Sequence, residues 1–208
     1  MTDKTDNPAA DIAWMRQVAE EGADAPMQGA SILMSAGLIY GAAALLHWAQ
    51  ISGVFPAADG LPLGIGWLVA TVVFLTVLFL IIGRLKRNGG VMTAGNRATG
   101  TTWSALGWGI FALFASMAAM SLRGGEASAE VSFALIPSVI MVFYGIGWAV
   151  SAAMYRSRNL WALAFGSFVA APLLALLSGQ AEQYLAYAAA LFLLMALPGW
   201  MLMRAARR

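Results

Sequence analysis

Residues 63–82 read LGIGWLVATVVFLTVLFLII, a run of 20 residues with no charged side chain. A helix that crosses the hydrocarbon core of a bilayer, about 30 Å thick, needs about 20 mostly apolar residues. The run is followed by three basic residues, Arg84, Lys86 and Arg87. Basic residues commonly follow a span where it leaves the membrane on the cytoplasmic side. The stretch therefore predicts a transmembrane helix.

Five further segments have the same length and apolar character: residues 29–48, 101–122, 131–155, 160–178 and 184–203. The connections between them are short and hold half of the charged residues, and the other half lie in the two terminal segments. We therefore predict an all-α fold, a polytopic bundle of six transmembrane helices. Residues 29–208 form this membrane domain, and residues 1–28 form a polar tail.

The composition supports a membrane protein and excludes several other classes. The chain has 208 residues, of which 61% are hydrophobic and 11% are charged, and its mean hydropathy is +0.74. A soluble domain of this size usually has about 25% charged residues. A net charge of +2 does not make a polybasic surface. We therefore expect contact with membrane lipid and none with nucleic acid, and we exclude a soluble enzyme and a disordered chain.

The distribution of basic residues predicts the orientation of the chain. The tail, the second and fourth connections and the carboxyl-terminal segment hold every Lys and Arg except Arg123. Four acidic residues lie in the connections on the other side: Asp59, Glu126, Glu130 and Glu182. Because cytoplasmic loops carry an excess of Lys and Arg, both termini are predicted to be cytoplasmic.

The polar tail contains one candidate helix. Asn7 can cap it, and Pro8 suits its first position. Ile12, Met15 and Val18 then lie on one face. This pattern favours a short helix lying at the inner membrane surface, with a solvated cytoplasmic helix as the alternative.

Reactive groups are scarce in this sequence. None of the six predicted spans contains Asp, Glu, Lys or Arg, and the chain has no Cys and a single histidine, His47. Ionisable residues within spans usually mark proton relays, ion pathways or ligand counter-ions, and metal and haem sites usually need several ligands. We therefore expect no bound cofactor or metal and no catalytic activity.

Two spans have rows of small residues on one face. Small residues let helices approach closely in lipid, where close packing holds them together. The expected packing residues are Gly37 and Gly41 in the first span and Ala105, Gly109, Ala112 and Ser116 in the third. We expect these two spans to be central.

Aromatic residues suggest a candidate ligand cavity. Tyr144, Trp148 and Ser151 follow each other at helical spacing in the fourth span. Tyr40 and Tyr144 lie at one predicted depth, and Trp108 and Trp148 at another. Convergence of these side chains would form an aromatic pocket for a flat or amphipathic ligand. The alternative is ordinary helix packing with local hydrogen bonds.

A second candidate polar site lies near the outer end of the first span. It consists of His47 and Gln50. The functional interpretation is a proton-sensitive gate or a ligand contact that faces the outer side. The alternative is an interfacial histidine bonded to a backbone carbonyl or to water.

Two resemblances bear on the type of protein. Residues 19–29, AEEGADAPMQG, resemble the start of small uncharacterised bacterial inner-membrane proteins, which implies that location and no activity. Six spans with short loops, together with Asn96, Thr101, Ser104 and Gly107 at the entry to the third span, are similar to the acetate/succinate channel family. The Asn-Pro-Ala-Pro-Leu-Gly entry of that family to its first helix is missing, so no site residues are carried over.

These observations leave three hypotheses for the function. The first is an accessory or regulatory membrane subunit that acts through a protein partner or as a homo-oligomer. The second is a channel or facilitator for a small neutral or weakly acidic solute, which would use the stripe of the fourth span. The third is the membrane subunit of an ABC-type exporter, with the basic segment 84–97 as its docking surface.

Overall fold

The computed structural model describes residues 12–13, 29–55, 64–87, 93–121 and 126–206. All elements within these residues are helices: α2 (Ala30–Ile51), α3 (Gly64–Arg87), α4 (Ala94–Ser121), α5 (Glu126–Met154), α6 (Arg158–Leu176), α7 (Glu182–Leu191), the π-turn η1 (Phe192–Ala196) and α8 (Leu197–Ala205). The last three form one continuous span, Glu182–Ala205.

Six of the described helices are long and apolar enough to cross a membrane. The predicted all-α bundle of six transmembrane helices is therefore confirmed, and the chain is a multi-pass membrane protein. The predicted interfacial helix lies almost entirely outside the described residues. Only Ile12 and Ala13 are described there, and both are helical and exposed.

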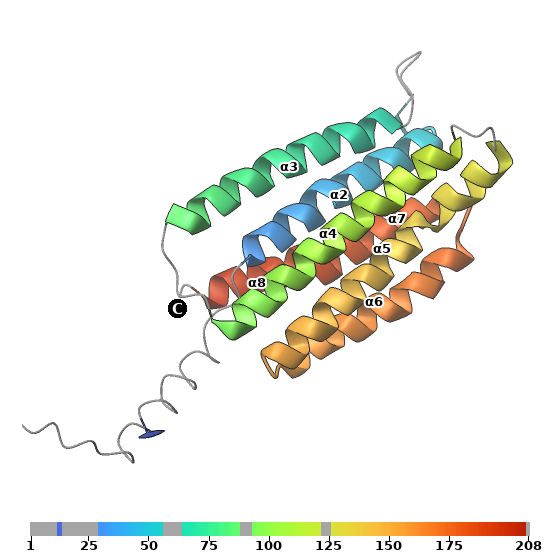
Figure 1. Cartoon of the computed structure of the whole chain (residues 1–208). Coiled ribbons are helices and arrows are strands. Elements are labelled where there is room, and N and C mark those ends of the chain that lie inside the picture. Colours follow the sequence, from blue (N-terminus) through green and yellow to red (C-terminus); the bar gives the residue numbers. More distant parts are fainter. Residues whose placement is uncertain (1–11, 14–28, 56–63, 88–92, 122–125, 207–208) are drawn as a thin grey trace, which may run out of the picture.

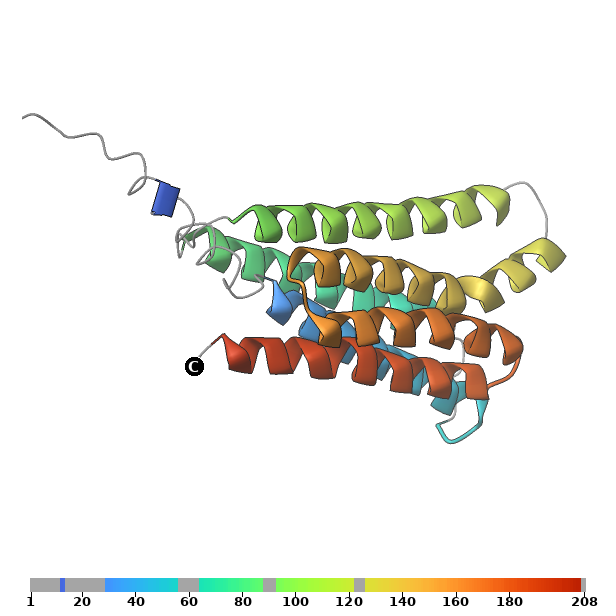
Figure 2. The ribbon, with the colours of Figure 1, turned by 90° about the horizontal axis from the view of Figure 1, so that it is seen from below.

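The described helices run side by side along the bundle (Figure 1). The core is built from α2, α5, α6 and the last span. α2 lies along α7, η1 and α8, whereas α5 lies between α4 and α6. α3 packs mainly on α2 at one edge of the bundle (Figure 1). Figure 2 shows α4 on the outside of α5.

Two ends of the bundle are distinguished below. The His47 end contains the last turn of α2 and the connection from α6 to α7. The opposite end contains the start of α4, the connection from α5 to α6 and the carboxyl terminus. There, the hydroxyl of Thr93 accepts a hydrogen bond from the backbone N–H of Asn96 at 3.1 Å. This cap explains why α4 begins at Ala94, seven residues before the predicted start at Thr101.

The expectation that the first and third spans are both central is wrong for the third. α4 packs mainly on α5, and three of its predicted packing residues, Ala105, Ala112 and Ser116, are exposed. A methyl group at Gly109 would reach only the Phe143 ring, at 3.9 Å. The spacing of small residues identifies a helix face, but it does not reveal which surface that face meets.

Two small residues of α2, Gly37 and Gly41, lie close against the last span. A methyl group at Gly37 would collide with the backbone of Ala196, and one at Gly41 would lie 2.6 Å from the Phe192 ring. Both partners belong to η1, the π-turn of the last span. The missing side chains of Gly37 and Gly41 therefore allow α2 to lie against that turn.

Substitution of Gly37 by Ala should destabilise the protein, because the backbone of Ala196 would have to move. We expect a loss of about 1–3 kcal/mol and a lower melting temperature in mild detergent. Gly109→Ala is the matched control, because its methyl group would make only ordinary contact and Ala favours a helix by up to about 1 kcal/mol. Equal melting temperatures for the two variants would contradict the contact between α2 and η1.

Candidate functional site

The centre of the bundle contains a buried aromatic cluster with its own hydrogen bonds. Trp148 is 0% exposed and Tyr144 is 8% exposed. The indole N–H of Trp103 donates to the Ser151 hydroxyl at 3.2 Å, and that hydroxyl donates to the Gly147 carbonyl at 2.7 Å. The Trp103 ring lies 5.4 Å from the Trp148 ring. These contacts connect α4 to α5 within a packed interior.

The hydrogen bond of Trp148 compensates for a proline in the last span. Its indole N–H donates to the Leu194 carbonyl at 3.0 Å. In an α-helix that carbonyl would accept from the N–H of residue 198, but Pro198 has none. An unpaired carbonyl in the hydrocarbon region would cost several kcal/mol. Trp148 therefore supplies a donor that the helix itself lacks.

The side chains of Tyr40, Trp108, Tyr144 and Trp148 do not converge on one pocket, and the structure agrees with the alternative of helix packing with local hydrogen bonds. Trp108 is 72% exposed, and its ring contacts Phe111 on the same helix. Tyr40 packs against Phe74 of α3 with ring centres 5.4 Å apart. Trp103, and not Trp108, contacts Tyr144 and Trp148. It comes five residues before Trp108 and therefore lies about 140° away from it around the axis of α4. Counting residues along the helices predicts the depth of each side chain in the membrane. It does not predict which side of α4 turns toward α5.

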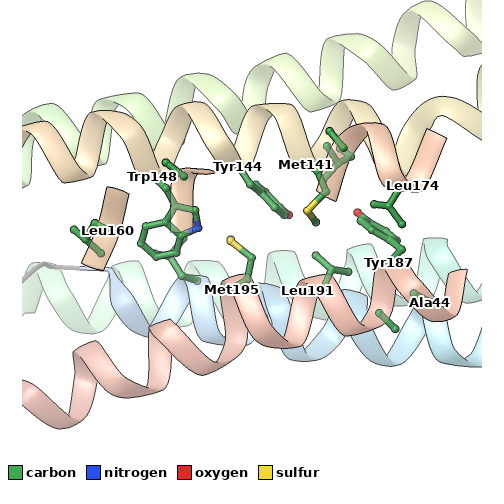
Figure 3. Close-up of a cluster of buried hydrophobic side chains, with 14 of the residues drawn as sticks. Ala44, Met141, Tyr144, Trp148, Leu160, Leu174, Tyr187, Leu191 and Met195 are labelled. Atoms are coloured by element: carbon green, nitrogen blue, oxygen red, sulfur yellow. The ribbon is translucent and has the colours of Figure 1, made fainter. Parts of the chain in front are cut away.

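Further aromatic residues extend from this cluster toward the His47 end. Figure 3 shows the hydroxyls of Tyr144 and Tyr187 pointing toward one another beside Met141. The Tyr187 ring lies 6.4 Å from Trp67, and Trp67 lies 6.0 Å from His47. A series of rings thus runs along the bundle from the buried centre to the His47 end.

A cavity of about 300 Å³ opens at the His47 end. Its described lining residues are His47, Ile51, Ala134, Gly179, Gln180, Ala181, Gln183 and Tyr184. His47 and Tyr184 face each other across 4.1 Å between ring centres. Gln50, which the sequence grouped with His47, is half-buried and is not among these lining residues. The cavity therefore places His47 together with residues of the connection between α6 and α7, and not with Gln50.

The orientation of the His47 ring follows from its partner on α3. The indole N–H of Trp67 donates to Nδ1 of His47 at 3.3 Å. An indole nitrogen can only donate, so Nδ1 carries no proton in this arrangement. Neutral His47 must then hold its proton on Nε2. His47 is therefore a hydrogen-bond donor through Nε2, which has no hydrogen-bond partner among the described residues.

Gln183 is the second polar residue of this cavity, and the sequence alone did not single it out. It is 1% exposed. Its amide nitrogen donates to the carbonyls of Ala134 at 2.7 Å and Leu174 at 3.1 Å. Carbonyls only accept, so these bonds fix which end of the amide is nitrogen. Gln183 thereby joins α5, α6 and α7, and its oxygen has no hydrogen-bond partner in the described part of the chain.

The described residues include no group of three or more His, Asp or Glu side chains that could hold a metal ion. The described polar atoms at the His47 end can donate and accept hydrogen bonds. No family model, curated protein or solved structure matches this chain. The resemblances inferred from residues 19–29 and from the entry to the third span stay predictions.

Replacement of Trp148 by Phe should remove the hydrogen bond to the Leu194 carbonyl while keeping an aromatic ring. We expect a loss of about 1–3 kcal/mol, the usual cost of an unpaired buried acceptor. Trp108→Phe is the matched control, and because Trp108 is exposed its effect should stay within about 0.5 kcal/mol. Both are measured as melting temperatures in the same detergent.

A second substitution tests the role of Pro198 in this bond. Combining Trp148→Phe with Pro198→Ala restores a backbone N–H four residues after Leu194. The double variant should regain part of the lost stability. If it is no more stable than Trp148→Phe alone, the Leu194 carbonyl is not the group that needs the indole.

Proposed function

We propose that the protein is a non-catalytic membrane subunit that acts through another membrane protein and docks it on the exposed face of α4. The observation that carries the proposal is the composition of that face. Many of the exposed residues there are small or bear hydroxyls: Gly100, Thr101, Ser104, Ala105, Gly107, Ala112, Ala115 and Ser116. They surround exposed aromatic side chains, Trp108, Phe111 and Phe114. In membranes such residues are enriched where helices meet.

α4 is held firmly at its first half, which positions this face. The Tyr155 hydroxyl donates to the side-chain oxygen of Asn96 at 2.6 Å, and Trp103 donates to Ser151. A methyl group at Gly147 would lie 2.8 Å from the Trp103 ring, so the contact is close. These bonds fix the rotation of α4 about its axis and leave its small residues directed away from α5.

α3 offers a comparison, because it is equally peripheral. Ala70 is its only buried residue, and most of the exposed residues in its apolar stretch are large, among them Leu68, Val72, Phe79 and Leu80. Such side chains suit contact with acyl chains. α4 exposes more small and hydroxyl-bearing residues than α3 does, and this difference supports a protein partner on α4 and lipid on α3.

The facilitator hypothesis receives less support. It required a path lined by Tyr144, Trp148 and Ser151, and all three are buried in contact with neighbouring helices. The Trp148 and Ser151 polar atoms are bonded within the chain. A solute would have to displace these contacts, so we favour the interaction protein.

Cross-linking tests the α4 surface directly. A photoreactive residue at Ala112 should give an adduct of defined mass with one protein in cell membranes, whereas one at Val72 of α3 should react with lipid. An adduct of twice the chain mass would identify a second copy as the partner. If Ala112 gives only lipid adducts, α4 faces lipid and the proposal is wrong.

A bulky substitution, Ser116→Phe, should weaken the adduct at Ala112 without lowering the melting temperature.

We also propose that the protein lies in a bacterial inner membrane with the His47 end outside. The support is the excess of basic residues in the terminal segments and in the second and fourth connections, which favours cytoplasmic termini. A reporter that is active only outside the cytoplasm should be inactive after Arg208 and active when inserted beside Asp59. Activity after Arg208 would contradict the orientation.

A further inference from the structure

We propose that the cavity at the His47 end binds a small uncharged planar molecule that offers a hydrogen-bond donor and an acceptor on one edge, as a primary amide does. The proposal is independent of the partner on α4. It rests on the geometry of three lining residues, His47, Gln183 and Tyr184.

The first element is a fixed donor. Trp67 occupies Nδ1 of His47, and the Tyr184 ring lies beside the imidazole at 4.1 Å between centres. The Nε2–H group is the polar edge that these two contacts leave for the cavity. Trp67 of α3 and Tyr184 of α7 fix the orientation of the imidazole ring. A ligand carbonyl could therefore accept from Nε2–H without a rotation of the ring.

The second element is a fixed acceptor. Gln183 is almost completely buried, and its amide nitrogen is held by the carbonyls of Ala134 and Leu174. Because these bonds determine the direction of the amide, its oxygen is the polar atom that remains for the cavity. A ligand N–H group that reaches this oxygen would donate to it.

The remaining lining restricts the size and charge of the ligand. A volume of about 300 Å³ lies at the lower limit of known small-molecule sites. Ile51, Ala134 and Ala181 contribute apolar walls, and no described lining residue is Asp, Glu, Lys or Arg. Glu182 is exposed and is not part of the lining. The described lining therefore offers a charged molecule no counter-ion to replace its lost hydration.

Benzamide is a suitable probe, because it is flat, uncharged and carries both groups on one edge. It should bind the full chain in lipid nanodiscs with a Kd on the order of 1 mM, as expected for about nine non-hydrogen atoms. Benzoate at pH 8, which has the same shape but a negative charge, and toluene, which has no polar edge, should each bind at least about tenfold more weakly. Ligand-observed NMR measures all three, with empty nanodiscs subtracted.

Three variants separate a site from partition into lipid. His47→Phe keeps a ring but loses the donor, and should weaken benzamide binding about tenfold, the usual effect of one hydrogen bond. Ala181→Leu should fill the cavity and abolish binding while both polar residues stay in place. Gln50→Ala is the matched control, since Gln50 lies one turn from His47 outside the lining, and it should bind like the original chain.

The outcomes decide the proposal in either direction. Loss of binding in Ala181→Leu, with an unchanged melting temperature, supports the site even if His47→Phe fails to fold. Benzamide binding that is equal in Ala181→Leu and in the original chain would overturn the proposal. Benzoate binding as tight as that of benzamide would also overturn it.

Discussion

The Leu194 carbonyl needs a hydrogen-bond donor from outside its own helix, and this need organises the centre of the bundle. Pro198 removes its helical donor, and the bilayer offers no water in exchange. The indole N–H of Trp148 reaches across from α5 to supply the missing bond. Because the same turn of the last span lies against Gly37 and Gly41 of α2, one irregularity connects three of the spans. The π-turn, the two glycines of α2 and Trp148 together accommodate Pro198 in the last span.

A related requirement shapes the His47 end. The α6 helix ends at Leu176, and its last carbonyls need donors from outside the helix. The Leu174 carbonyl receives the Leu177 N–H at 3.2 Å and the Gln183 amide at 3.1 Å. The same amide also bonds Ala134 of α5. Gln183 thus joins three helices by serving backbone groups, and this role explains why a polar side chain is almost fully buried there.

The sequence predicted the number of spans and most of their limits, because length and hydropathy determine whether a helix can cross a bilayer. It could not predict how each helix is rotated. Gly37 and Ala112 belong to similar rows of small residues, yet Gly37 meets η1 and Ala112 is exposed. Likewise, Trp148 is buried and Trp108 is exposed at the same expected depth. Rotation depends on contacts between distant residues, such as Trp103 with Ser151, and no local pattern encodes these. For the same reason His47 could be recognised as unusual, while its cavity partner Gln183 could not.

The distribution of bonded and unbonded polar atoms separates structural from chemical roles. In the centre, the polar atoms of Trp103, Trp148 and Ser151 bond other groups of the chain, so they hold the helices together and have little capacity left for a solute. At the His47 end, Nδ1 of His47 and the amide nitrogen of Gln183 are bonded. Nε2 of His47 and the amide oxygen of Gln183 have no partner among the described residues, and both residues line a cavity. Burial alone would have pointed to the aromatic centre as the site. The remaining hydrogen-bonding capacity points instead to the His47 end, where a ligand can gain bonds without breaking those that stabilise the fold.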